Sequence, residues 1–146
     1  MPSNSEPSSN MTPAMKAHAT GRWAETMFRA LSARVAKRWQ FISFRGAGKG
    51  EWKGVVDVLA IRKNTAIPSA ADLKRGDLFE IILVQIKGGA AKAPTDTDCL
   101  RLQAVAKHYN AKDIVQFCWV KGKKVEFSIL QQDRTWKASS GSEIFG

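Results

Sequence analysis

The first pattern along the chain is helical, because apolar residues recur every three or four positions. From about residue 13 onward, one face of this segment would form a continuous apolar stripe that can pack against a core. The residues of the stripe are Ala24, Met27, Phe28, Leu31 and Val35. Residues 1–12 are rich in Ser, Pro and Asn and have little to bury. We therefore expect a flexible tail over residues 1–12 and a single domain over residues 13–146.

Three strand-like segments follow the predicted helix. Trp39–Phe44 is aromatic and β-branched and ends at a Gly-rich turn. Trp52–Arg62 is apolar on both faces, which is typical of a strand deep in a covered sheet. A long polar connection, Lys63–Asp77, leads to the third strand, Leu78–Lys87, which is followed by a Gly-Gly pair.

A second helix and a hairpin are predicted in the C-terminal half. Thr95 followed by Asp98 matches a capping box, so a helix should run from there to about Tyr109. Ile114–Val120 and Val125–Leu130 flank a basic Lys-Gly-Lys-Lys turn, which predicts two hairpin strands. The predicted order of elements is αβββαββ. Two helices framing a sheet indicate an α/β or α+β sandwich.

The charge balance favours a polyanionic partner. The 146 residues include 23 Lys and Arg against 13 Asp and Glu, which gives a formal net charge of +10. Such an excess attracts nucleic acid through phosphate contacts and counterion release. Basic proteins without a specific site are also common, so charge supports nucleic-acid binding without defining it.

Cysteine usage and hydropathy favour an intracellular, non-membrane protein. Cys99 and Cys118 form no CxxC pair and lie in apolar surroundings, as expected for buried thiols in a reducing compartment. The N-terminal residues contain no apolar signal region, and no run approaches the ~18 apolar residues of a membrane span. We expect a cytoplasmic protein, associated with the nucleoid if its source is a bacterium or a phage, and no membrane partner.

Three polar residues interrupt the apolar strands: Asp57, Gln85 and Lys87. An unpaired charge inside a core strand would be costly, so Asp57 must have a partner. Gln85 and Lys87 share a face, since side chains two apart on a strand point the same way. If the two strands are neighbours, the three side chains and the carbonyl of Ile86 can converge at one end of the sheet. The alternative is a structural Asp57–Lys87 ion pair with Gln85 filling hydrogen bonds.

The oxygen-rich set predicts a site for Mg²⁺ or Mn²⁺. Magnesium prefers hard oxygen ligands and is usually held by one or two carboxylates together with substrate phosphate. A metal at Asp57 would lower the pKa of bound water and polarise a phosphodiester. Lys87 would orient or stabilise the attacking hydroxide and the developing negative charge.

Two segments resemble the paired motifs of the PD-(D/E)XK nuclease superfamily: Gly54–Ile61 (GVVDVLAI) and Ile82–Gly88 (ILVQIKG). The similarity covers about residues 20–130. It implies a restriction-endonuclease-like αβββαβ core with a mixed central sheet flanked by helices. Most members carry Glu or Asp where this chain has Gln85, whereas Mrr-like restriction endonucleases commonly have Gln-x-Lys. The resemblance therefore points to a DNase of that branch.

The amide at Gln85 binds a cation more weakly than a carboxylate does, so the resemblance calls for a compensating acid. Several families of the superfamily carry a Glu on the first helix that completes the metal shell. Glu25 is the matching candidate here, both as a catalytic residue and as a metal ligand. An ion pair between Glu25 and Arg22 or Arg29 along the helix is the alternative.

We therefore expect a Mg²⁺-dependent endonuclease that hydrolyses DNA phosphodiester bonds. The alternative is a catalytically weak or inactive nucleic-acid-binding or scaffolding subunit of a larger complex with the same fold. DNA is the expected partner rather than RNA, and a homodimer or a partner protein would supply specificity. RNA and branched junctions stay open as substrates. Weaker candidates for nucleic-acid contacts are Lys49, Lys53, Gly88 and Lys107.

Overall fold

One mixed sheet organises the fold. The structure, a computed structural model, describes residues 24–44, 54–88, 94–119 and 124–146. Its strands are β1 (Gln40–Ser43), β2 (Val58–Lys63), β3 (Phe79–Gly88), β4 (Asp113–Trp119), β5 (Glu126–Leu130) and β6 (Trp136–Ser139). They lie side by side in sequence order. Only the β3–β4 pair is parallel among these neighbouring strands, because α2 carries the chain back between them.

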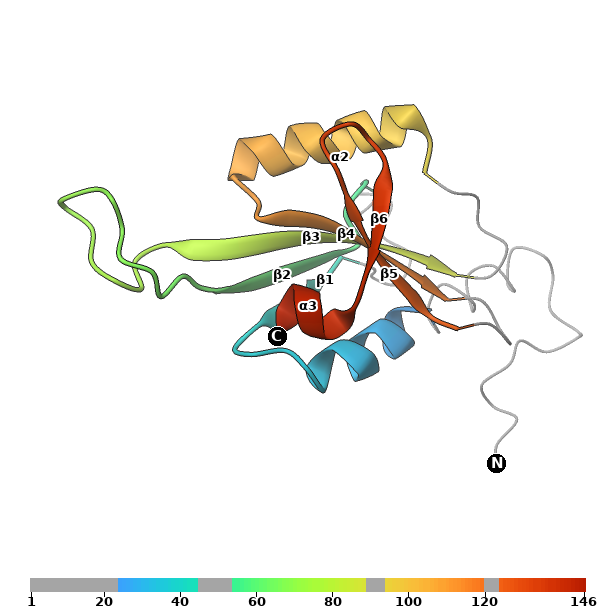
Figure 1. The fold of residues 1–146 in the computed structure, drawn as a ribbon, viewed down its shortest axis with the longest axis horizontal. Coiled ribbons are helices and arrows are strands. Elements are labelled where there is room, and N and C mark those ends of the chain that lie inside the picture. The colour runs from blue at the N-terminus through green and yellow to red at the C-terminus, as the bar shows by residue number, and fades with distance from the viewer. Residues whose placement is uncertain (1–23, 45–53, 89–93, 120–123) are drawn as a thin grey trace, which may run out of the picture.

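Helices cover both faces of the sheet (Figure 1). The helix α2 (Asp96–Tyr109) lies on one face, where it packs against β3 and β4. The helical residues 24–33 and the short α3 (Gly141–Phe145) lie on the other face. Over its described residues the chain is thus an α+β protein with a six-stranded mixed sheet, one parallel strand pair and three helices.

Each sheet face has its own apolar core, because side chains alternate along every strand. The face below the helical residues 24–33 buries an aromatic cluster centred on Phe28, which has none of its surface exposed. The face below α2 buries Leu83 of β3 together with Cys99 and Leu102 of α2. The polar residues predicted to carry chemistry therefore belong to one face or the other, and this decides which of them can meet.

Most predicted elements are confirmed, with one correction at the candidate site. Thr95 and Asp98 form the expected capping box, in which each side chain accepts a hydrogen bond from the other residue's backbone N–H. The prediction of a strand over Trp52–Arg62 was wrong at its start: β2 begins only at Val58. Asp57 therefore precedes the strand instead of interrupting it, which frees its side chain to turn toward β3.

The last strand and helix were missed by the sequence analysis. In β6 only the first and last residues are partly covered, so the strand lacks an alternating pattern, and the five residues of α3 are too few to show a helical repeat. Ser140 caps α3 by accepting a hydrogen bond from the Glu143 N–H at 3.2 Å. Tertiary contacts that bury Ile144 and Phe145 hold this short helix in place.

Two expectations concern residues that the structure does not describe. The predicted tail, residues 1–12, and the start of the first helix near residue 13 lie outside the described residues. Among the residues that are described, no helix combines the length and apolar character needed to cross a membrane.

Candidate functional site

Asp57 joins β1, β2 and β3 at one end of the sheet. Its N–H donates to the Val84 carbonyl and its carbonyl accepts from the Phe44 N–H, both at 2.9 Å. Its carboxylate Oδ2 accepts a 2.7 Å hydrogen bond from the Ile86 N–H. Because β2 begins at Val58, it has no residue paired with Ile86. The Asp57 carboxylate therefore accepts from the Ile86 N–H in place of a backbone carbonyl. Asp57 is thereby fixed against the residue that separates Gln85 from Lys87.

Gln85 is the most unusual polar residue in this cluster, since only 5% of it is exposed. Its Nε2 donates to the Val55 carbonyl at 3.4 Å, which is long for a hydrogen bond. Its Oε1 is buried and has no hydrogen-bond partner among the described residues. A buried acceptor left without a donor costs on the order of 1–3 kcal/mol. An amide oxygen without a donor is a ligand of the kind that a hard cation takes, and Gln85 directly precedes the residue whose N–H the Asp57 carboxylate accepts from.

Ile86 and Lys87 complete the arrangement on β3. The N–H and C=O of one strand residue point to the same edge, so the Ile86 carbonyl faces the same side as the N–H that Asp57 accepts from. Lys87 is half-buried, shares the face of Gln85 and pairs in register with Cys118 of β4. The structure thus brings Asp57 to the Gln85–Lys87 segment through the Ile86 N–H.

Glu25 belongs to the opposite face of the sheet. The carboxylate accepts a 2.7 Å hydrogen bond from the Ser43 hydroxyl and lies 3.8 Å from Arg29 in an i,i+4 ion pair. Ser43 pairs with Val58, so Glu25 is at the same end of the sheet as Asp57. Gln85 and Lys87, by contrast, point toward the α2 side. Among the described residues, Glu25 therefore contacts Ser43 and forms the ion pair with Arg29 that was the alternative to a metal-binding role.

Polar residues of β4 and β5 that share this face were not predicted from the sequence. The register places Gln116 beside Gln85 and Cys118 beside Lys87. On the next strand, Ser128 lies beside Gln116 and Glu126 lies beside Cys118. Burial, and then the charge of Glu126, raise the pKa of the Cys118 thiol. Alternating polar positions within Asp113–Trp119 were the available signal. Which strand lies beside β3 is a property of the topology, so the neighbours could not be assigned from the sequence.

The ligand set is sparse in carboxylates. Among the described residues no group of three or more His, Cys, Asp or Glu side chains is arranged to hold a metal ion. Glu80 cannot contribute, because it lies at the far end of β3 and forms a 2.6 Å ion pair with Arg62. What fits a cation is one carboxylate, the orphaned Gln85 oxygen and the Ile86 carbonyl. Magnesium can be held by so few protein ligands when waters and substrate phosphate complete its shell.

No family model, curated protein or solved structure matches the chain.

The remaining sequence candidates lie in different places. Lys49 and Lys53 fall outside the described residues. Gly88 ends β3 and pairs with Trp119, next to Lys87. Lys107 is exposed near the C-terminal end of α2, beside the start of β4. Because β3 and β4 are parallel, Lys107 is near the opposite end of the sheet from Lys87.

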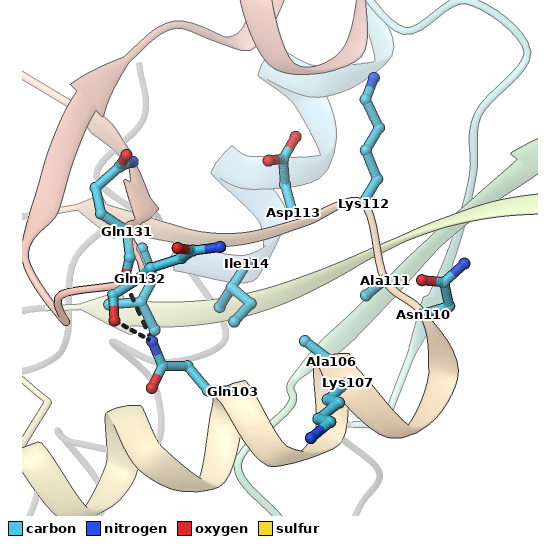
Figure 2. A pocket seen from close by; sticks show the side chains of 11 residues that line it. Gln103, Ala106, Lys107, Asn110, Ala111, Lys112, Asp113, Ile114, Gln131 and Gln132 are labelled. Atoms are coloured by element: carbon cyan, nitrogen blue, oxygen red, sulfur yellow. Dashed lines mark hydrogen bonds between the residues drawn. The ribbon is translucent and has the colours of Figure 1, made fainter.

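Lys107 borders a separate pocket of about 400 Å³ between α2, the start of β4 and the β5–β6 turn (Figure 2). Gln103 spans it by donating to the carbonyls of Gln131 and Gln132, both at 3.2 Å. Lys112 and Asp113 contribute mainly backbone, since their side chains extend to the side of β4 away from α2. The described side chains that border this pocket include no cluster suited to catalysis.

Asp113 provides a pH-dependent test of the structure near this pocket. Burial raises the pKa of its carboxyl above the ordinary 3.8, although Lys112 acts in the other direction. The folded state therefore binds the proton more tightly, and this residue's contribution to stability is lost as pH rises through the raised pKa. We expect Asp113→Asn to raise the melting temperature modestly at pH 7 and to have little effect below about pH 3.8, measured by thermal unfolding.

Asp133 serves as a control of opposite sign. Hydrogen bonds from the Thr135 hydroxyl at 2.6 Å and the Thr135 N–H at 3.1 Å lower the pKa of its carboxyl. Its contribution is present above pH 3.8 and is lost as pH falls through the lowered pKa. Asp133→Asn should therefore not stabilise the protein at neutral pH. Equal pH responses of the two variants would contradict the assignment.

Proposed function

We propose that this protein is a metal-dependent endonuclease that hydrolyses DNA phosphodiester bonds at the Asp57–Lys87 cluster. The observation that carries the proposal is the 2.7 Å hydrogen bond of the Asp57 carboxylate with the Ile86 N–H, together with the buried oxygen of the preceding Gln85, which has no donor among the described residues. This end of the sheet therefore combines a fixed anion, an unsatisfied acceptor and the Lys87 side chain. The formal charge of +10 suits a nucleic-acid substrate.

The proposed family is the PD-(D/E)XK superfamily, in its Gln-x-Lys variant. Support comes from the motifs around Asp57 and Lys87 and from the strand arrangement. An antiparallel β1–β2–β3 meander is followed by α2 and a parallel β4, which agrees with the core that the resemblance implies. In this proposal β5, β6 and α3 are additions to that core.

Each residue would have a distinct role. Asp57 Oδ2 accepts from the Ile86 N–H, and a carboxylate has two oxygens and about four lone-pair sites, so Asp57 can serve as a cation ligand while that bond is maintained. The Gln85 Oε1 and the Ile86 carbonyl would be the other protein ligands. Bound Mg²⁺ or Mn²⁺ would supply Lewis acidity toward the phosphodiester and its attacking water. Lys87 would hold that water by hydrogen bonding and stabilise the charge that develops on the phosphate.

The proposal is tested by nicking of supercoiled DNA in Mg²⁺ or Mn²⁺ with Asp57→Asn and Lys87→Met. Asn retains an oxygen for the Ile86 N–H but removes the charge, and Met retains most of the length of Lys. We expect both variants to lose activity by about 100-fold or more. They should keep the wild-type melting temperature within a few degrees and still bind DNA.

Lys137→Met is the matched control, because Lys137 is exposed on β6 and its loss changes the net charge equally. It should nick at the wild-type rate. Nicking that survives both Asp57→Asn and Lys87→Met would come from a contaminant and would remove the nuclease proposal.

A non-catalytic nucleic-acid-binding or scaffolding subunit is the second candidate. It is favoured by the single carboxylate in the described part of the cluster and by the amide at Gln85. DNA binding without metal-dependent nicking, in a protein whose Asp57→Asn variant binds equally well, would support it. In either case we propose that a second copy or another protein supplies sequence specificity, which sedimentation with and without DNA would test.

A further inference from the structure

A second pocket lies at the opposite end of the sheet from Asp57. It has a volume of about 550 Å³, and its lining includes Arg38, Gln40, Ile61, Lys63, Arg75 and Phe79. Phe79 begins β3 and Lys87 is eight residues further along the same strand, so the two sites are separated by roughly 26 Å. This pocket is therefore a separate feature from the proposed active site.

The sheet register places a cation next to an aromatic ring. Lys63 pairs with Phe79 across β2 and β3, so the two side chains share a face. Gln40 pairs with Ile61 on that same face, and Arg38 lies two residues before Gln40. The helix α2 packs on β3 and β4, and the Phe79 residue is 57% exposed. Phe79 thus presents a ring surface to solvent within a basic rim.

The loop between β2 and β3 positions Arg75. Hydrogen bonding of the Asn64 N–H to the Leu78 carbonyl at 2.8 Å closes the base of the loop. Asp77 caps a tight turn, since its Oδ2 accepts from the Lys74 N–H at 2.7 Å. Gly76 has a φ of 91°, a backbone conformation that residues other than glycine rarely adopt. This glycine allows the turn that presents Arg75. Arg75 is therefore held on a braced loop.

Of the basic side chains at this pocket, one has an acidic partner and three do not, among the described residues. Arg62 is paired with Glu80 at 2.6 Å, and its guanidinium lies 4.3 Å from the centre of the Trp39 ring. The side chains of Arg38, Lys63 and Arg75, by contrast, form no ion pair with any described residue. Three uncompensated cations around one pocket create a local positive potential that selects for anionic ligands.

We propose that this pocket binds a nucleotide unit, with its phosphate held by Arg38, Lys63 and Arg75 and its base stacked on Phe79. Cations beside an exposed aromatic ring are the usual combination for binding single strands, since every base offers a π-face to the ring. The pocket volume is within the usual range for small ligands. The inference rests on the nucleic-acid partner of the proposed function, but not on catalysis.

The test measures binding of fluorescein-labelled oligo(dT) and of a labelled duplex by anisotropy, in EDTA so that cleavage cannot interfere. Lys63→Glu and Arg75→Glu should each weaken oligo(dT) binding by about tenfold and reduce its salt dependence. Phe79→Ala should weaken oligo(dT) binding by about tenfold and change duplex binding less. Lys137→Glu, at an exposed position of β6, is the control with the same charge change and should bind as wild type.

Competition with ATP identifies the source of the nucleotide unit. Displacement of oligo(dT) only at ATP concentrations far above the oligonucleotide affinity assigns the pocket to a nucleic-acid strand. Displacement at comparable concentrations assigns it to free nucleotides. The proposal is overturned if Lys63→Glu, Arg75→Glu and Phe79→Ala bind as wild type, or if Lys137→Glu weakens binding equally.

The two proposals can fail separately. Absence of nicking together with weakened binding by the pocket variants removes the nuclease and keeps the nucleotide pocket. Metal-dependent nicking with unchanged binding by these variants removes the pocket and keeps the nuclease. A wild-type protein that binds neither oligonucleotide nor ATP contradicts the pocket, whatever the nicking assay gives.

Discussion

Replacing Gln85 with Glu should make the stability of this protein depend on divalent cations. The residue is 5% exposed, and its Oε1 already lacks a donor among the described residues. A carboxylate there would be a buried charge near Asp57, which costs roughly 3 kcal/mol or more when uncompensated. We expect a melting temperature well below wild type in EDTA, with much of the loss recovered in Mg²⁺ or Mn²⁺ because the cation binds only the folded state.

Gln85→Leu is the matched control, since it removes the amide at similar size and adds no charge. Loss of the orphaned oxygen should leave the melting temperature near wild type and insensitive to metal. The nicking activity of Gln85→Glu provides a second measurement, because a carboxylate is a stronger ligand than an amide and should raise the rate at limiting Mg²⁺. A melting temperature of Gln85→Glu that is equal in EDTA and in Mg²⁺ would contradict a cation site at this position.

Replacing Phe28 with alanine should cause the largest loss of stability among single changes on the other face of the sheet. The ring is fully buried and lies 5.4–6.3 Å, centre to centre, from four others: Phe41, Phe117, Phe127 and Phe145. Removing a buried ring costs about 3–5 kcal/mol through lost transfer energy and the cavity left behind. Chemical denaturation should show this decrease in the free energy of unfolding.

Phe79→Ala is the control, because Phe79 is 57% exposed and its truncation leaves no buried cavity. The loss should stay within about 0.5 kcal/mol. Equal losses for Phe28→Ala and Phe79→Ala would contradict the aromatic core. Phe28 also joins the helical residues 24–33 to the C-terminal Phe145, so its replacement should expose both to proteolysis.

The features that could be predicted are those that depend on contacts between residues close together in the sequence. The capping box of Thr95 and Asp98 was found because its two residues are three apart and contact each other directly. The apolar run of β3 was found for the same reason, and the two-residue period of a strand placed Gln85 and Lys87 on one face. The short β6 and α3 were missed because long-range burial stabilises them.

The sequence by itself singled out three polar residues within apolar segments, Asp57, Gln85 and Lys87. Its spacing also placed Gln85 and Lys87 on one face of a strand. Only the tertiary structure decided their partners. The late start of β2 turns Asp57 toward the Ile86 N–H, and the sheet separates Glu25 from Gln85. The register also gathers Lys63 and Phe79 with Arg38 at the far end. The reason is physical: periodicity fixes the face of a side chain, but pairing between distant segments fixes what it meets.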